Sequence, residues 1–277
     1  MRRRLLHACG ALAAGGALLL AGCSSGADGK PDGKGRTSAS ATGRPTTSPT
    51  AGATPSTLDF TPDPKRAPKN AAEARRLALA IVAGPDAWGP GYVKRTPYLS
   101  QEGYWPVLGA DCTWDGGTQP GSVLSSVTAS MEIPATGGKG ALRVSATVTV
   151  HRTEDDADWE MAGTLEEALR CPDQELREGE HITGLISLGN PFGVGGNYTA
   201  SDSLGERGFY VSSGVKGKQI YGWYQSRIGQ VTVATVVKGA PGYGEKDTPT
   251  TKGTINAQVQ ALVTMLERLK AQLAVQS

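Results

Sequence analysis

The hydrophobic and polar positions divide the chain into three zones. Residues 5–20 are mostly Leu, Ala and Gly, and three arginines precede them. Residues 24–69 are rich in Ser, Thr, Pro, Gly and Ala, with Leu58 and Phe60 as their only large apolar residues. In residues 70–277, apolar side chains recur at the spacing of helices and strands, which predicts that this zone is the globular part.

Three segments of the globular part show the spacing of amphipathic helices. The first begins with Asn70 followed by Glu73, which is typical of a capping box. The second follows Thr153, carries acidic residues in its first turns that suit the helix dipole, and ends at Cys171. The third follows Thr254. The expected buried stripes are Leu77, Ile81 and Val82; then Trp159, Ala162, Leu165 and Leu169; then Ile255, Val259, Leu262, Val263, Leu266, Leu269 and Leu273.

Period-two alternation of apolar and polar residues predicts strands. Residues 123–133 and 142–151 alternate in this way around a turn, so they are expected to pair as an antiparallel hairpin. The order of helix, hairpin, helix, strands and helix predicts an α+β fold, in which an antiparallel sheet is packed by two or three helices. The remaining predicted strands are 182–188, 207–213, 219–226 and 230–238.

The segment 86–121 is rich in Gly, Pro and aromatic residues and is predicted to be a long loop made of turns. One interpretation of its aromatic side chains is a stacking surface for sugar rings or another flat ligand. The other is that they fix the loop to the core, because buried aromatic side chains dominate core packing in ordinary domains. The candidate ligand-binding residues are Trp88, Tyr92, Tyr104, Trp105 and Trp114.

The apolar run near the N-terminus closes with Leu20-Ala21-Gly22-Cys23, which resembles the lipobox of bacterial lipoproteins. The resemblance implies that residues 1–22 are a signal peptide cleaved between Gly22 and Cys23, and that Cys23 carries diacylglycerol. The protein would then lie at the outer face of the cytoplasmic membrane. The alternative is an uncleaved transmembrane anchor, although the run is short for a span. The three arginines also loosely resemble a twin-arginine export signal, so the export route stays open.

Residues 23–69 are predicted to be a disordered tether behind the lipidated cysteine. They carry too little apolar surface to offset the entropy of ordering. Thr46-Thr47-Ser48-Pro49-Thr50 is a candidate site for O-linked sugar, with a bare linker as the alternative.

Charge limits the partners of residues 70–277. The full chain has a net charge of +2, but its leader and tether hold ten basic and four acidic residues. The globular part keeps 18 basic and 22 acidic residues, a net charge of −4. We therefore expect no nucleic-acid partner and no polybasic membrane-binding patch.

The globular part has two cysteines and no recognisable catalytic motif. Because the protein is expected to be exported, Cys112 and Cys171 are predicted to form a disulfide, with a catalytic thiol as the alternative. Its histidines, His151 and His181, lie in no zinc-binding motif, and no nucleophile elbow occurs. We therefore expect no metal, no cofactor and no enzymatic activity, while carboxylates paired only in space stay an open alternative.

The globular part coarsely resembles the secreted α+β domains of actinobacterial lipoproteins and the extracellular sensor domains of mycobacterial serine/threonine kinases. The likeness lies in the stretch from Trp105 to Cys112, in Cys171 after an acidic helix, and in the strands from Gly222 to Val237 before the terminal helix. It implies a non-catalytic binding or sensing module. A pocket is expected between the sheet and either residues 86–121 or residues 239–253. The alternatives are a protein or wall-polymer scaffold without a pocket, and an envelope hydrolase built from scattered carboxylates.

The lipobox makes a direct prediction. Cys23→Ala is expected to abolish incorporation of labelled palmitate and to stop signal-peptide removal, because the sulfur of Cys23 is the atom that would carry the lipid. Cys9→Ala is the matched control and is expected to label as the wild type does. If Cys23→Ala is processed and bound to the membrane at the wild-type level, the lipoprotein interpretation is wrong.

Overall fold

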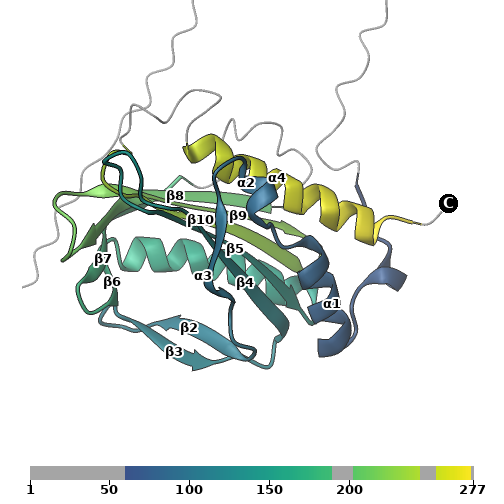
Figure 1. Ribbon diagram of the computed structural model, residues 1–277. Helices are drawn as coiled ribbons and strands as arrows, with labels where there is room; N and C mark the ends of the chain where they lie inside the picture. The colour runs from purple at the N-terminus through teal and green to yellow at the C-terminus, as the bar shows by residue number, and fades with distance from the viewer. Residues whose placement is uncertain (1–59, 189–201, 244–253, 276–277) are drawn as a thin grey trace, which may run out of the picture. The chain divides into compact units, whose positions relative to one another are not determined.

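The computed structural model describes residues 60–188, 202–243 and 254–275 (Figure 1). The predicted signal peptide, the lipidation site at Cys23 and the tether up to residue 59 lie outside these residues. Contacts of the domain extend to Phe60, which packs against the core, and to a short 3-10 helix, η1 (Pro64–Arg66). Residues 60–66, which the sequence assigns to the tether, thus include contacts with the globular part.

The described residues form an antiparallel sheet of eight strands in the order β1-β4-β5-β10-β9-β8-β7-β6, and a separate two-stranded hairpin, β2–β3. This confirms the predicted α+β class with an antiparallel sheet. The pairing of β10 with β5 joins the β4–β5 hairpin to the meander that runs from β6 to β10. The strands are β1 (Val93–Leu99), β2 (Tyr104–Leu108), β3 (Trp114–Thr118), β4 (Val123–Ile133), β5 (Leu142–His151), β6 (Gln174–Arg177), β7 (Glu180–Ser187), β8 (Asp202–Ser212), β9 (Gln219–Ile228) and β10 (Val231–Lys238).

Helices cover both faces of the sheet. The helices are α1 (Ala71–Ile81), α2 (Pro85–Trp88), α3 (Glu154–Arg170) and α4 (Thr254–Leu273). α4 lies against β9 and β10 and contacts α1 and α2, whereas α3 lies on the opposite side of the sheet (Figure 1). Two of the three expected N-caps are confirmed, since the side chain of Asn70 accepts from the amide of Glu73 and that of Thr153 from the amide of Asp156. The third, Thr254, is the first helical residue of α4.

The main core lies between the sheet and the layer of α1, α2 and α4. The alternation predicted for β5 is confirmed, because Val144, Ala146 and Val148 are buried while the residues between them face the other side. Val231 and Val233 extend this apolar face into β10. The predicted stripe of α4 is buried at Leu262, Leu266, Leu269 and Leu273, and Met265 joins them.

The prediction that residues 86–121 form only turns was wrong. The segment contains α2 and the strands β1, β2 and β3. Pro97 in β1 and Pro106 in β2 hide the strand pattern, because proline is normally excluded from strands. β1 is an edge strand of the large sheet, where a missing amide donor is tolerated.

The predicted buried stripe of α3 was also wrong. The side chains of Trp159 and Leu169 are 77% and 73% exposed, and Leu165 is 38% exposed. Instead, Ala157, Met161 and Ala168 are buried. Glu160, Thr164 and Glu167 share the sheet-facing side of the helix with them, so α3 presents both polar and small apolar side chains to the sheet.

The predicted disulfide between Cys112 and Cys171 is confirmed, and it ties the turn between β2 and β3 to the end of α3. Polar contacts reinforce this junction. Arg170 Nη1 donates to the carbonyl of Gly109 at 2.9 Å, and Trp114 Nε1 donates to Gln174 Oε1 at 2.8 Å. The hairpin is therefore held to the sheet through α3 and β6.

Removing the disulfide tests its contribution to stability. The bond joins residues 59 positions apart, so Cys112→Ser is expected to lower the free energy of unfolding by about 4 kcal/mol through the entropy of the unfolded chain. Urea unfolding measures this change. Cys171→Ser and the double variant should lose the same amount, and a loss below about 1 kcal/mol would contradict the chain-entropy argument.

Candidate functional site

The face of the sheet that points away from the main core is mixed. It is polar along β5 and around Glu160. Beside these groups lies a smaller apolar cluster, which consists of Ala168 of α3 with Ile182, Leu185, Tyr210, Tyr221 and Val236 of the strands. Strand alternation places Ser145, Thr147, Thr149 and His151 of β5 on it. Register extends the same face into β10 at Thr232 and into β9, β8 and β4. α3 contacts β5, β7, β8, β9 and β10 on this side. We call the side chains enclosed between α3 and this face the polar layer; they are His151, Glu160, Thr164, Glu167, Glu206, Tyr221, Gln225 and Thr232.

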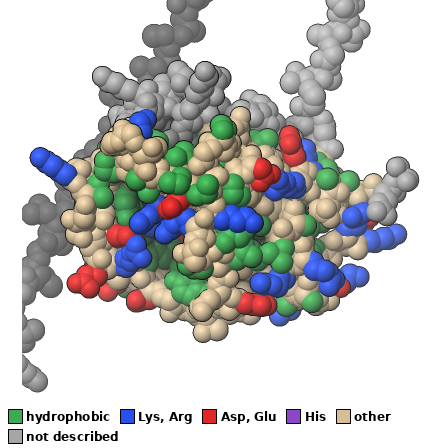
Figure 2. All heavy atoms as spheres, viewed as in Figure 1, with side chains coloured by type: hydrophobic (Ala, Val, Ile, Leu, Met, Phe, Trp, Pro, Cys, Tyr) green, Lys and Arg blue, Asp and Glu red, His purple; other side chains and the backbone are tan. Residues whose placement is uncertain are grey.

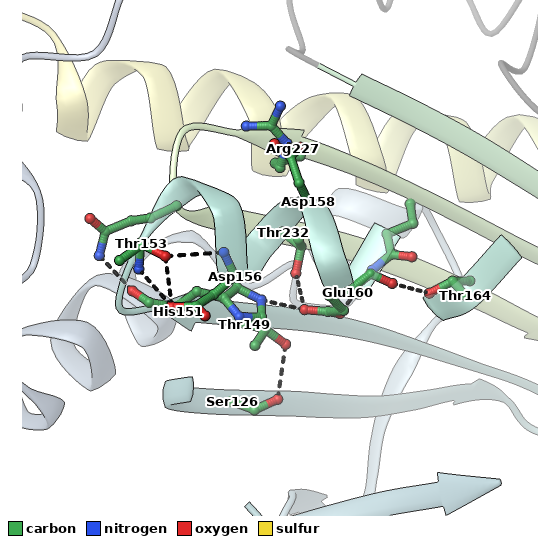
Figure 3. Close-up of polar contacts among 12 residues, drawn as sticks. Ser126, Thr149, His151, Thr153, Asp156, Asp158, Glu160, Thr164, Arg227 and Thr232 are labelled. Atoms are coloured by element: carbon green, nitrogen blue, oxygen red, sulfur yellow. Dashed lines mark hydrogen bonds and ion pairs between the residues drawn. The ribbon is translucent and has the colours of Figure 1, made fainter. Parts of the chain in front are cut away.

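Glu160 is the centre of the polar layer (Figure 3). Its Oε2 accepts from Thr232 Oγ1 at 2.9 Å and forms a short contact with His151 Nε2. Its Oε1 accepts from Gln225 Nε2 at 2.8 Å. His151 is 2% exposed and Gln225 is fully buried. A buried carboxylate is costly unless it accepts hydrogen bonds, so these donors from β5, β9 and β10 fix the position of α3 on the sheet.

Contacts at the start of α3 surround this centre (Figure 3). Thr153 and Asp156 form a reciprocal capping box. Asp158 Oδ1 lies 2.7 Å from Arg227 Nε, which links the first turns of the helix to β9. On the sheet, Ser126 Oγ lies 3.1 Å from Thr149 Oγ1. The N-terminal half of α3 is thus attached to β9 through Asp158, in addition to the contacts of Glu160.

Two further acidic side chains of the polar layer, Glu167 of α3 and Glu206 of β8, have raised pKa values. Burial raises the pKa of Glu206 to about 8, and the charge of Glu167 adds to the shift. Burial raises the pKa of Glu167 to about 7 against the lowering effect of Arg170. Glu206 Oε1 is buried without a hydrogen-bond partner in the structure. Burial also raises the pKa of Tyr221, with smaller contributions from both carboxyls.

The shifts of Glu167 and Glu206 bear on the hydrolase alternative. A glycosidase separates its carboxyls into an ionised group and a protonated acid, so their pKa values are pushed apart. Here burial raises the pKa values of both carboxyls. This pair therefore lacks the opposed shifts that the hydrolase hypothesis requires.

A mixed-charge cluster lies at the far end of the same sheet face. Glu180 of β7 pairs with Arg177, with Arg143 Nη1 at 3.8 Å and with Lys238 Nζ at 3.9 Å. Burial opposes ionisation of Glu180, but Arg177, Tyr210 and Lys238 outweigh it and hold its pKa below the usual value. Figure 2 shows basic side chains with acidic ones beside them on the face in view, separated by apolar side chains.

Between this cluster and Glu160, the β4–β5 part of the face presents half-buried hydroxyl groups. Thr128 Oγ1 and Thr147 Oγ1 lie 2.9 Å apart across the two strands. Ser126, Ser130 and Ser145 have the same partial exposure. We call these five residues the hydroxyl face. They offer donors and acceptors to a polar ligand.

The structure places the predicted aromatic residues in two separate environments. Trp88 is 1% exposed within the main core, and the ring centroid of Tyr92 lies 5.7 Å from it. Trp88 therefore offers no face to a ligand. Tyr104, Trp105 and Trp114 belong to the β2–β3 hairpin, where Tyr104 is 50% exposed. The interpretation that aromatic side chains fix this segment to the core fits Trp88 and Tyr92, and ligand binding by the hairpin residues stays a prediction.

Four other expectations concern the two cysteines, a metal site, a membrane span and residues 239–253. Cys112 and Cys171 are joined, so neither is a free thiol. Within the described ranges, no group of three or more His, Cys, Asp or Glu side chains is arranged to hold a metal ion. Among the described helices, none is long and apolar enough to cross a membrane. The proposed rim at residues 239–253 lies mostly outside the description.

Comparison with protein-family models and with curated proteins found no match for this chain. The resemblance to actinobacterial lipoproteins and kinase sensor domains therefore stays a prediction. The function has to be argued from the geometry of the chain itself.

Sequence reasoning missed the polar layer, although one signal was present. Glu160, Thr164 and Glu167 follow one another at four- and three-residue steps, so they share one side of a helix. Residues of β5 that face away from the core supply matching polar groups. The partners Gln225 and Glu206 could not be found this way, since their proximity depends on strand register.

The raised pKa of Glu206 predicts a pH dependence of stability. Because the pKa of Glu206 is higher in the folded state than its ordinary value of 4.5, binding of a proton to Glu206 stabilises the fold. This contribution is complete below the ordinary value and is lost as the pH rises through about 8. Glu206→Gln keeps the shape of the neutral acid. It is expected to match the wild type at pH 4.5 and to exceed it at pH 9 by an amount on the order of a few kcal/mol in urea unfolding.

Glu178→Gln is the matched control, because Glu178 is exposed in the turn between β6 and β7. It should follow the wild-type pH profile. A wild-type slope in Glu206→Gln would show that Glu206 is ionised in the fold and would contradict the argument from burial.

Proposed function

We propose that this chain is a lipid-anchored envelope protein whose globular domain binds a ligand or partner outside the cytoplasmic membrane. The leader and lipobox support the location. The Cys112–Cys171 disulfide also supports it, because such bonds persist in oxidising compartments outside the cytoplasm.

The hydroxyl face is the observation that carries the proposal of binding. The same strands bury an unbroken apolar face against α1 and α4, so their other face is free to be polar. On that other face, Thr128 and Thr147 remain partly exposed, and Ser130 and Ser145 lie between them and the ion pair of Arg143 with Glu180. Hydroxyl groups next to paired charges suit a polar ligand with several hydrogen-bonding groups, such as a segment of wall polymer.

The Glu160 network supports a binding role over a catalytic one. Both oxygens of Glu160 accept hydrogen bonds from buried donors, and this arrangement positions a helix. The raised pKa values of Glu167 and Glu206 do not divide into an acid and a base. A hydrolase is therefore the weaker alternative.

Native mass spectrometry of the full chain, recovered from the envelope of its own host, tests the proposal. The wild type is expected to release a bound species on mild denaturation. Thr128→Val with Thr147→Val removes two hydroxyls while keeping strand-forming residues of similar shape, and should lower occupancy roughly tenfold. Thr118→Val, on the exposed hairpin strand β3, is the control.

Two outcomes would contradict ligand binding at the hydroxyl face. One is a wild-type protein that carries no bound species. The other is a double variant that retains the species at wild-type occupancy while Thr118→Val does the same.

A further inference from the structure

We infer that the solvent-facing side of α3 is a docking surface for a basic amphipathic helix of a protein partner; the inference rests on the proposed function and names the class of partner. Trp159, Ala162, Leu165 and Leu169 lie on this side at three- and four-residue steps. We call these four residues the apolar ridge. Trp159 and Leu169 are more than 70% exposed, and single exposed apolar residues are common, but a Trp and two Leu in one helical row are not.

The apolar ridge is exposed although a different rotation of α3 would bury it. Rotating the helix would bury Trp159 and Leu169 against the sheet, which the hydrophobic effect favours. The structure instead buries Glu160 with three hydrogen-bonding partners and exposes the apolar residues. The ion pair of Asp158 with Arg227 of β9 and the disulfide at Cys171 hold the two ends of the helix in this orientation.

Charge identifies the chemistry of the partner. The exposed side of α3 carries four carboxylates, Glu154, Asp155, Asp158 and Glu166. Two of them are paired, Glu166 with Arg170 at 2.9 Å and Asp158 with Arg227 at 2.7 Å, so Glu154 and Asp155 give this side an acidic excess. An anionic lipid surface would be repelled by these carboxylates, and so would a second copy of α3 in a symmetric contact. A partner with Lys and Arg beside its apolar residues would be attracted.

The spacing of the ridge identifies the shape of the partner. Apolar side chains three and four residues apart on α3 form a ridge of the kind that packs into the groove of another helix. An amphipathic helix that docks in this way presents its own anchors at the same spacing. A basic amphipathic helix therefore satisfies both the apolar ridge and the carboxylates around it.

Site-specific photocrosslinking of the full chain in its own host tests the inference. A benzophenone side chain at position 159 or 169 is expected to crosslink to one protein segment that alternates Lys or Arg with apolar residues at helical spacing. The same group at Leu79, which is exposed on α1 on the other side of the sheet, is the positional control. Crosslinked peptides are sequenced by mass spectrometry.

A charge variant tests the role of the carboxylates. Glu166→Lys is expected to lower the crosslinking yield from position 159 by about tenfold, because it places a like charge against the partner. Glu178→Lys, on the exposed β6–β7 turn, should leave the yield unchanged. Resistance of Cys112 and Cys171 to alkylation shows that each variant retains the disulfide.

Several results would overturn the inference. They are crosslinks to lipid, crosslinks to a second copy of this chain, a target segment without basic residues, equal yields at positions 159 and 79, and a yield that Glu166→Lys does not lower. Each can occur while the hydroxyl face still releases its ligand, so failure of this inference is distinguishable from failure of the proposed function.

Discussion

The need of a largely enclosed carboxylate for hydrogen-bond donors is the constraint on which the rest of this structure depends. Glu160 enters the space between α3 and the sheet and is met by His151, Gln225 and Thr232, each from a different strand. Those donors set the rotation of the helix about its axis. That rotation in turn decides which side chains are enclosed and which remain in solvent.

The same constraint explains why the two faces of one sheet differ. The face under α1 and α4 is apolar and is covered by apolar helices. The other face carries hydroxyl, amide and charged groups beside a smaller apolar cluster, and α3 contributes both polar side chains and Ala168 to it. On this face Glu206 is buried with its Oε1 lacking a hydrogen-bond partner, and its pKa rises to about 8. The hydroxyl face and the buried carboxyl of Glu206 therefore both lie on the side of the sheet that points away from the main core.

The sequence predicts the parts of the fold that depend on local pattern. Asn70 and Thr153 mark helix starts because their side chains cap neighbouring amides. The β4–β5 hairpin follows from alternation around one turn, and the disulfide follows from an even pair of cysteines in a globular part that the leader predicts to be exported. β1 and β2 were missed because Pro97 and Pro106 contradict strand propensity. The side of α3 that is buried was missed because apolar spacing alone assumes an apolar partner surface, and the polar partners lie far away in sequence.

The pairing of β10 with β5 has a consequence for how the chain assembles. β4–β5 and the meander from β6 to β10 can each form from neighbouring segments, but Val231 must find Val150 about 80 residues earlier in the chain. Closing a loop of that length costs entropy before its contacts are formed, which slows folding. The sheet is therefore completed only when β10 pairs with β5, because this long-range contact joins two parts that are each built from neighbouring segments.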